Sequence, residues 1–182
     1  MFKSCRSVGI TAMTDNKETG KKRKNSLRLT AICGILAAFV FLGTQLRIPT
    51  AIGYINLGDA VILAASYVAG PAALFPAAVG SALSDLIAGY PLYIAPTFVI
   101  KGLMGLVAGI IMKHPEHRPS LVRRLMAGIA AELIMAGGYF AFEVFAYGFA
   151  PAAGSVPFNL IQAAAALIIA VPSSYLLKNI KA

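Results

Sequence analysis

Long apolar runs, separated by short polar or Gly-Pro stretches, fill the chain from residue 27 onward. Six such runs can be distinguished, at 27–46, 56–69, 71–89, 94–112, 121–148 and 156–177. A helix needs about 20 residues to cross roughly 30 Å of hydrocarbon. The pattern therefore predicts an all-α polytopic membrane protein, with a six-transmembrane-helix bundle over residues 27–178.

The first 26 residues have a different pattern. They are polar, contain the basic run Lys21-Lys22-Arg23-Lys24, and lack the continuous apolar stretch of a signal peptide. We expect residues 1–26 to form a disordered, basic tail on the cytoplasmic side. Either Met1 or Met13 can be the start of translation.

Composition supports the membrane assignment. The chain of 182 residues is 58% hydrophobic and only 13% charged, with a mean hydropathy of +0.76. Soluble domains are usually about half apolar or less, so the lipid bilayer is the expected solvent. The net charge of +9 then reports orientation in the membrane, and no nucleic-acid partner is expected.

The number of spans depends on Gly70-Pro71, which is all that separates the second and third runs. If these two runs form one Pro-broken helix, the chain has five spans. With six spans, all of the 16 basic residues except Arg47 and Lys101 fall on one side of the membrane. The positive-inside rule then favours six spans with both termini in the cytoplasm.

Ionisable and amide side chains within the apolar runs are the candidate functional residues, because an ionisable group in hydrocarbon costs about 2.5 kcal/mol or more. In the six-span arrangement most of them reach the outer half of the membrane. Spacings of seven and four place Glu132, Tyr139 and Glu143 on one stripe of the fifth helix. The pattern predicts an outward-facing site for a small polar molecule, with substrate-binding residues Asn56, Asp59, Asp85, Tyr93, Lys101, Glu132, Tyr139, Glu143, Asn159 and Gln162.

Each of these side chains also has a structural interpretation. Asp85 and Lys101 can form a buried ion pair that only stabilises the fold. Glu132 and Glu143 can hydrogen-bond neighbouring helices, and the amides of the sixth span can cap a helix or join helices. Tyrosines near the outer boundary, such as Tyr93, are often interface anchors.

A second pattern lies on the first span, where small residues recur with a spacing of about four. Its members Thr30, Ala31, Gly34 and Ala38 allow another helix to approach closely. This stripe can serve a partner protein or packing within the fold. A similar stripe of Lys101, Gly105 and Gly109 on the fourth span is more easily absorbed into the fold.

Motifs for catalysis are absent from the sequence. It contains no P-loop, no HExxH and no GxSxG. We therefore expect no enzymatic activity, no cofactor and no metal. Two alternatives to an importer subunit are a stand-alone secondary transporter and a membrane scaffold protein without a ligand.

The stretch YINLGDAVILAASYVAGP at 54–71, followed by the segment 81–89 with Asp85, resembles the substrate-binding S components of energy-coupling factor (ECF) vitamin transporters. The resemblance covers residues 27–178 and is closest to the riboflavin-type branch that is assigned to pyridoxine, hydroxymethylpyrimidine and related precursors. It implies a high-affinity subunit that captures a vitamin from outside. It also implies a shared transmembrane coupling protein and two cytoplasmic ATPase subunits as partners.

The same resemblance implies a docking surface for the coupling protein on the first helix. The family's Ala-x-x-x-Ala pattern maps onto Gly34 and Ala38, together with Ala31 or Thr30. Residues that contact the substrate differ among S components, so the candidate substrate contacts rest on their predicted depth in the membrane.

Overall fold

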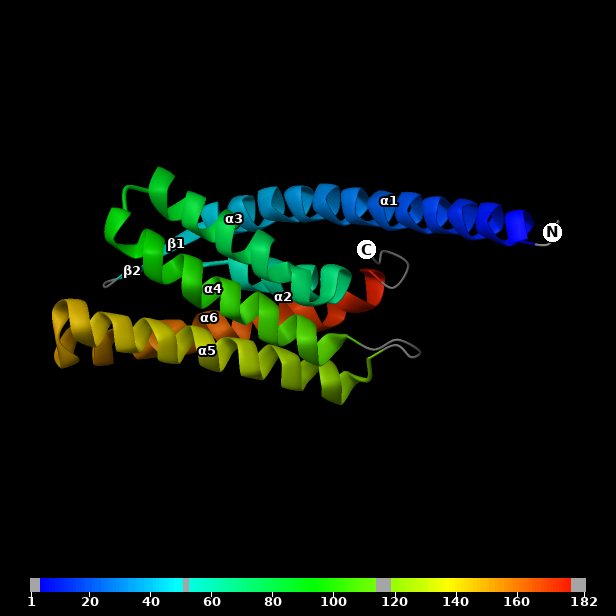
Figure 1. Cartoon of the computed structure of the whole chain (residues 1–182). Coiled ribbons are helices and arrows are strands. Elements are labelled where there is room, and N and C mark those ends of the chain that lie inside the picture. Colours follow the sequence, from blue (N-terminus) through cyan, green and yellow to red (C-terminus); the bar gives the residue numbers. More distant parts are fainter. Residues whose placement is uncertain (1–3, 51–52, 114–118, 178–182) are drawn as a thin grey trace.

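The computed structural model describes residues 4–50, 53–113 and 119–177, with side chains for 23–48, 56–113 and 119–177. Helices account for nearly all of it (Figure 1). The predicted helical class is confirmed, with one short β-hairpin added. The helices are α1 (Ser4–Gln45), α2 (Gly58–Ala69), α3 (Leu74–Ile87), α4 (Pro91–Met112), α5 (Leu121–Tyr147) and α6 (Phe149–Leu176).

The β-hairpin fills the connection between α1 and α2. Its strands β1 (Arg47–Thr50) and β2 (Gly53–Asn56) are antiparallel, with Arg47 opposite Asn56. The hairpin returns the chain so that α2 begins beside the end of α1, where the Leu57 N–H donates to the Gly43 carbonyl at 3.2 Å. We call this end of the bundle the hairpin end; the α3–α4 and α5–α6 turns lie there too (Figure 1).

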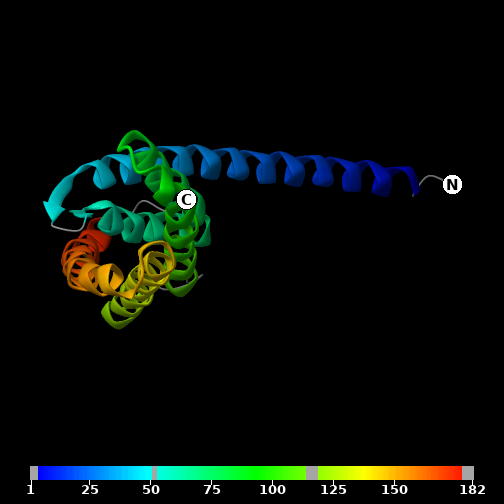
Figure 2. The same cartoon turned by 90° about the vertical axis from the view of Figure 1, so that its left-hand side faces the viewer.

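The chain reverses between α2 and α3 at a 3₁₀ turn, η1 (Gly70–Ala73). Gly70 has φ +57°, a region that glycine adopts without steric cost. Along α2, Asp59 contacts Lys101 of α4 and Ser66 contacts Gly105 of α4, so α2 and α4 run in the same direction. α3 returns toward the hairpin end beside α1 (Figures 1 and 2). The alternative of one continuous Pro-broken helix is therefore wrong.

Within the described part of the chain, five segments are long and apolar enough to cross a membrane, namely 23–45, 58–87, 91–112, 121–147 and 149–176. The second of these is the α2–η1–α3 unit. Its helices have 12 and 14 residues, or about 18 and 21 Å at about 1.5 Å per residue. Length and composition thus support five spanning segments, and the predicted count of six spans is not confirmed by them.

α1 begins well before the predicted first span. It runs from Ser4 through the segment predicted to be a disordered tail, and its first part extends away from the bundle in both views (Figures 1 and 2). The side chains of residues 23–28 are exposed, as expected for a polar segment with no apolar face to bury. That residues 1–26 lie in the cytoplasm stays a prediction.

Small residues allow the helices to pack closely. A Cβ added at Gly105 of α4 would lie 2.6 Å from the Ala73 carbonyl oxygen, and one at Gly80 of α3 would lie 2.6 Å from that of Ala37. The backbones therefore touch at these crossings, as in many membrane helix pairs. The predicted absorption of the Lys101, Gly105 and Gly109 stripe into the fold is confirmed.

Candidate functional site

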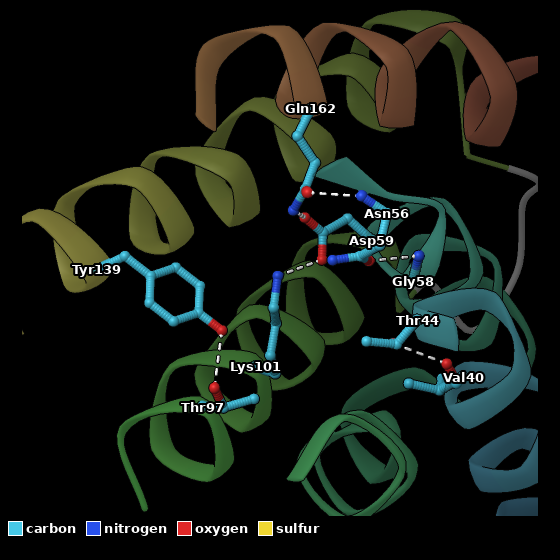
Figure 3. A network of polar contacts seen from close by, with 9 residues as sticks. All are labelled: Val40, Thr44, Asn56, Gly58, Asp59, Thr97, Lys101, Tyr139 and Gln162. Atoms are coloured by element: carbon cyan, nitrogen blue, oxygen red, sulfur yellow. Dashed lines mark hydrogen bonds and ion pairs between the residues drawn. The ribbon is translucent and has the colours of Figure 1, made fainter. Parts of the chain in front are cut away.

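A buried polar cluster joins α2, α4 and α6 near the hairpin end (Figure 3). Asp59 is fully buried and Lys101 is only 3% exposed, and the two form an ion pair. Gln162 Nε2 donates to the second carboxylate oxygen of Asp59 at 2.6 Å. Both oxygens of Asp59 are therefore occupied by donors from helices more than 40 residues away along the chain.

The start of α2 places Asp59 in this cluster. The Asn56 N–H donates to Gln162 Oε1 at 2.9 Å, and the Asn56 side-chain oxygen accepts from the Gly58 N–H at 2.8 Å. This is an Asx-type turn, which Asn favours. Gly58 has no room for a side chain, since an added Cβ would lie 2.7 Å from Asn56 Oδ1. These contacts explain why Asn, Gly and Asp occur together at 56–59.

Polar side chains also pair along the α4–α5 interface. Tyr93 donates its hydroxyl to Glu143 Oε1 at 3.4 Å, and the hydroxyls of Thr97 and Tyr139 are 3.0 Å apart. Lys101 Nζ lies 5.3 Å from the centroid of the Tyr139 ring, within the range of a cation–π interaction. The α4 residues recur every four positions and thus share one face of that helix.

Glu132 of α5 differs from the other acidic residues of the site, because its carboxyl group has no hydrogen-bond partner among the described residues. Its side chain is 4% exposed. It is close enough to Asp59 and Lys101 to interact with both electrostatically. A buried carboxylate without a partner is costly, so its position needs an explanation other than stability.

Glu143 lies nearer the hairpin end on the same stripe of α5. It accepts hydrogen bonds from Tyr93 of α4 and from Ser155 of α6. These contacts agree with the structural interpretation of Glu143 as a side chain that joins helices. They leave open a second role in binding, which stays a prediction.

Aromatic rings surround Tyr93 at this end of the bundle. Its centroid lies 5.1 Å from that of Phe142, and 6.3 Å from those of Tyr90, Tyr139 and Tyr147. The Tyr147 ring is stacked on it and the Phe142 and Tyr90 rings meet it edge on. Tyr93 is therefore the centre of an aromatic cluster rather than an isolated interface anchor.

The structure thus brings most of the predicted site residues together and corrects one pairing. Lys101 forms its ion pair with Asp59, so the alternative of an Asp85–Lys101 pair is wrong. Lys101 faces the start of α2, whereas Asp85 is buried near the end of α3. Asn159 of α6 is half-buried, and its side-chain nitrogen has no partner among the described residues.

Two residues of the site were not predicted from the sequence. Thr97 carries a signal that could have found it, since it lies four residues from both Tyr93 and Lys101. Ser155 carries none, because serine is common at membrane helix interfaces. Only the packing of α6 against α5 brings its hydroxyl to Glu143.

The opposite end of the bundle contains a buried cation. Arg124 of α5 is 2% exposed and lies between the rings of Tyr67 (4.7 Å) and Tyr175 (4.0 Å). Its Nε donates to the Pro119 carbonyl at 3.0 Å, and it also donates to the Ser174 hydroxyl. Arg124 therefore connects α2, α5 and α6.

The small-residue stripe of α1 faces away from the bundle. All four of its members, Thr30, Ala31, Gly34 and Ala38, are exposed, and a Cβ added at Gly34 meets nothing within 4 Å. The buried face of α1 instead carries Val40 and Thr44. Among the described residues, the stripe is not used for packing within the fold.

Comparison with known proteins identifies a family and a relative. The family described as ECF-type riboflavin transporter, S component, matches residues 24–181. A protein of Pyrococcus woesei, described as an uncharacterized protein in gap 3′ region, is 33% identical over 136 residues, which cover 74% of this chain and 89% of that protein. The family match includes the whole predicted membrane domain.

Proposed function

The chain belongs to the family of ECF-type riboflavin transporter S components, and from this membership we propose that it captures a vitamin or vitamin precursor from outside the cell. As a family member it is a substrate-binding subunit, not an enzyme, and associates with the ECF coupling protein and ATPases. The proposed substrate is a pyridoxine- or pyrimidine-like heterocycle.

The observation that carries the proposal is the convergence of buried polar side chains from four helices of an apolar bundle. Asp59, Lys101, Glu132 and Gln162 come from α2, α4, α5 and α6 and are all buried. Polar groups at membrane depth are expensive and commonly mark a binding site or pathway. Apolar helices around a few convergent polar groups are typical of small-molecule sites.

The proposed substrate meets two kinds of surface in this site. Polar groups of the Asp59–Lys101–Gln162 cluster replace the hydrogen bonds that the substrate loses with water. The Tyr93 and Tyr139 rings supply flat apolar surface for a heterocycle. The site is reached from the hairpin end, where the aromatic cluster lies.

We propose that the chain crosses the membrane six times and that both termini lie in the cytoplasm. α2 and α3 run in opposite directions, so the helices make an even number of passes and both termini lie on one side. The basic segments fall on that side, which the positive-inside rule assigns to the cytoplasm. The hairpin end is then the outer end. The short α2 is largely buried in the bundle, whereas α3 keeps an exposed apolar face.

The exposed stripe of α1 is proposed as the docking surface for the coupling protein. Thr30, Ala31, Gly34 and Ala38 present little side-chain volume, so a partner helix can approach the backbone of α1. The chain leaves this surface open while it packs the opposite face of α1 against α2 and α3.

The decisive experiment is purification of the complete transporter followed by mass spectrometry of any retained small molecule. We expect the coupling protein and ATPases to co-purify, and a heterocyclic vitamin or precursor to be released on denaturation. Vesicles containing the complex should accumulate that compound only with ATP inside. Uptake by this chain alone, without ATPases, would contradict the proposal and support a secondary transporter.

A further inference from the structure

We propose that Glu132 recognises a positively charged or N–H-bearing nitrogen of the substrate, so that the site selects a heterocycle with a protonated ring nitrogen or an amino group. This inference rests on the proposed function and adds the substrate's charge and hydrogen-bonding class to it. The inference concerns Glu132 because its carboxyl oxygens have no hydrogen-bond donor among the described residues.

The hydrogen bonds recorded for the donors of the cluster go to groups other than Glu132. Lys101 donates to Asp59, and the Gln162 amide donates to the other oxygen of Asp59. Thr97 and Tyr139 hydrogen-bond each other. Glu132 therefore keeps two buried acceptor oxygens with no donor among the described residues. A donor brought by a ligand would satisfy them.

The charge balance points to the same class of ligand. Asp59 and Glu132 together carry two negative charges when ionised, and Lys101 supplies one positive charge. Lys101 already balances Asp59, so ionisation of Glu132 would add a negative charge without a counter-ion in a setting where such a charge is costly. A cationic ligand, or one with strong N–H donors, lowers that cost, whereas an anionic ligand raises it.

The surrounding rings fit a flat ligand. Tyr139 lies between the two acidic positions on its stripe of α5, and its ring already faces the Lys101 ammonium at 5.3 Å. Aromatic faces attract cations and stack on heterocycles. Charge at Glu132 and aromatic surface at Tyr139 together favour a nitrogen heterocycle over an aliphatic amine.

Two probes test the inference by calorimetry on the purified full chain. The first is 4-amino-5-hydroxymethyl-2-methylpyrimidine, and the second is the same compound without the amino group. The wild-type protein should bind the amino compound at least tenfold more tightly. Equal affinities, or no binding of either probe, would overturn the inference.

Substitution of Glu132 then tests whether this residue causes the preference for the amino compound. Glu132→Gln keeps the shape but removes the charge, and it should abolish the difference between the probes. Ser81→Ala is a matched control, because Ser81 is also buried with an unpartnered hydroxyl, but on α3. This control should keep the preference. A Glu132→Gln protein that still prefers the amino compound would overturn the assignment of Glu132.

Thermal unfolding without added probe distinguishes recognition from a structural role. Glu132→Gln should unfold at the same temperature as wild type or higher, because it removes a buried carboxyl group that has no partner among the described residues. A lowered unfolding temperature would show that Glu132 stabilises the fold and would overturn the proposal. The proposed function is judged separately, by ATP-dependent uptake and the retained compound, and it survives failure of the probe experiments.

Discussion

Asp59 and Lys101 lie 42 residues apart in the chain and form a buried ion pair between the first turn of α2 and the middle of α4. Gln162 completes the contact from α6. This arrangement ties together α2, α4 and α6. It also leaves Glu132 as the one acidic side chain of the cluster without a donor among the described residues.

Breaking the pair from one side should destabilise the protein strongly. Lys101→Met leaves the Asp59 carboxylate buried with one donor lost, and removal of one partner of a buried pair costs about 3–5 kcal/mol. The double variant Asp59→Asn with Lys101→Met should recover much of this loss, because no charge of the pair remains. Thermal unfolding of the single and double variants in detergent measures the coupling. A double variant less stable than Lys101→Met alone would contradict the prediction.

Bulky side chains on the exposed face of α1 should uncouple binding from transport. Gly34→Leu with Ala38→Leu should abolish ATP-dependent uptake while the isolated chain still binds its substrate, because both positions are exposed and a Cβ added at Gly34 meets nothing within 4 Å. Uptake in vesicles and binding to the purified chain are the two measurements. Loss of substrate binding in this variant would contradict the assignment of the α1 stripe as a docking surface.

A glycine on the opposite interface provides the control for that experiment. Gly80 packs against α1, where an added Cβ would lie 2.6 Å from the Ala37 carbonyl oxygen. Gly80→Leu should therefore lower the yield of folded protein, whereas the α1 surface variant should fold normally. If both variants misfold alike, the α1 stripe is structural.

Arg124 should contribute to stability although it lies in a basic region of the sequence. Arg124→Ala removes two ring contacts and two hydrogen bonds from a buried site, and desolvated cation–π contacts are worth about 2 kcal/mol or more. Arg123→Ala is the neighbouring control, because Arg123 is only half-buried, and it should change stability much less than Arg124→Ala. Equal unfolding temperatures for the two variants would show that the buried contacts contribute nothing.

Cysteine labelling tests the six passes. In a protein with Cys5 and Cys33 replaced by Ser, Ala150→Cys at the hairpin end should react with a membrane-impermeant maleimide added outside. Ala72→Cys, in the η1 turn, should react only after the membrane is opened. Labelling of Ala72→Cys from outside would place the α2–α3 reversal on the outer side and contradict the proposed orientation.

The sequence was sufficient to predict the helical class and to identify the ionisable residues that are costly in a membrane. Hydrophobic run lengths report burial in lipid directly, so the membrane helices at 91–112 and 121–147 lie close to their predicted bounds. The α5 stripe followed from helical periodicity alone, because spacings of seven and four return to the same face. Depth in the membrane then marked Asp59, Lys101 and Glu132 as costly.

Tertiary structure alone decided which of these groups meet. Lys101 could reach an acid on α2 or on α3, and only the relative rotation and depth of the helices select Asp59 over Asp85. The β-hairpin, the role of Ser155 and the burial of Arg124 also depend on contacts between segments far apart in the chain. Periodicity determines the face of one helix, whereas the partner of a side chain depends on how two helices pack.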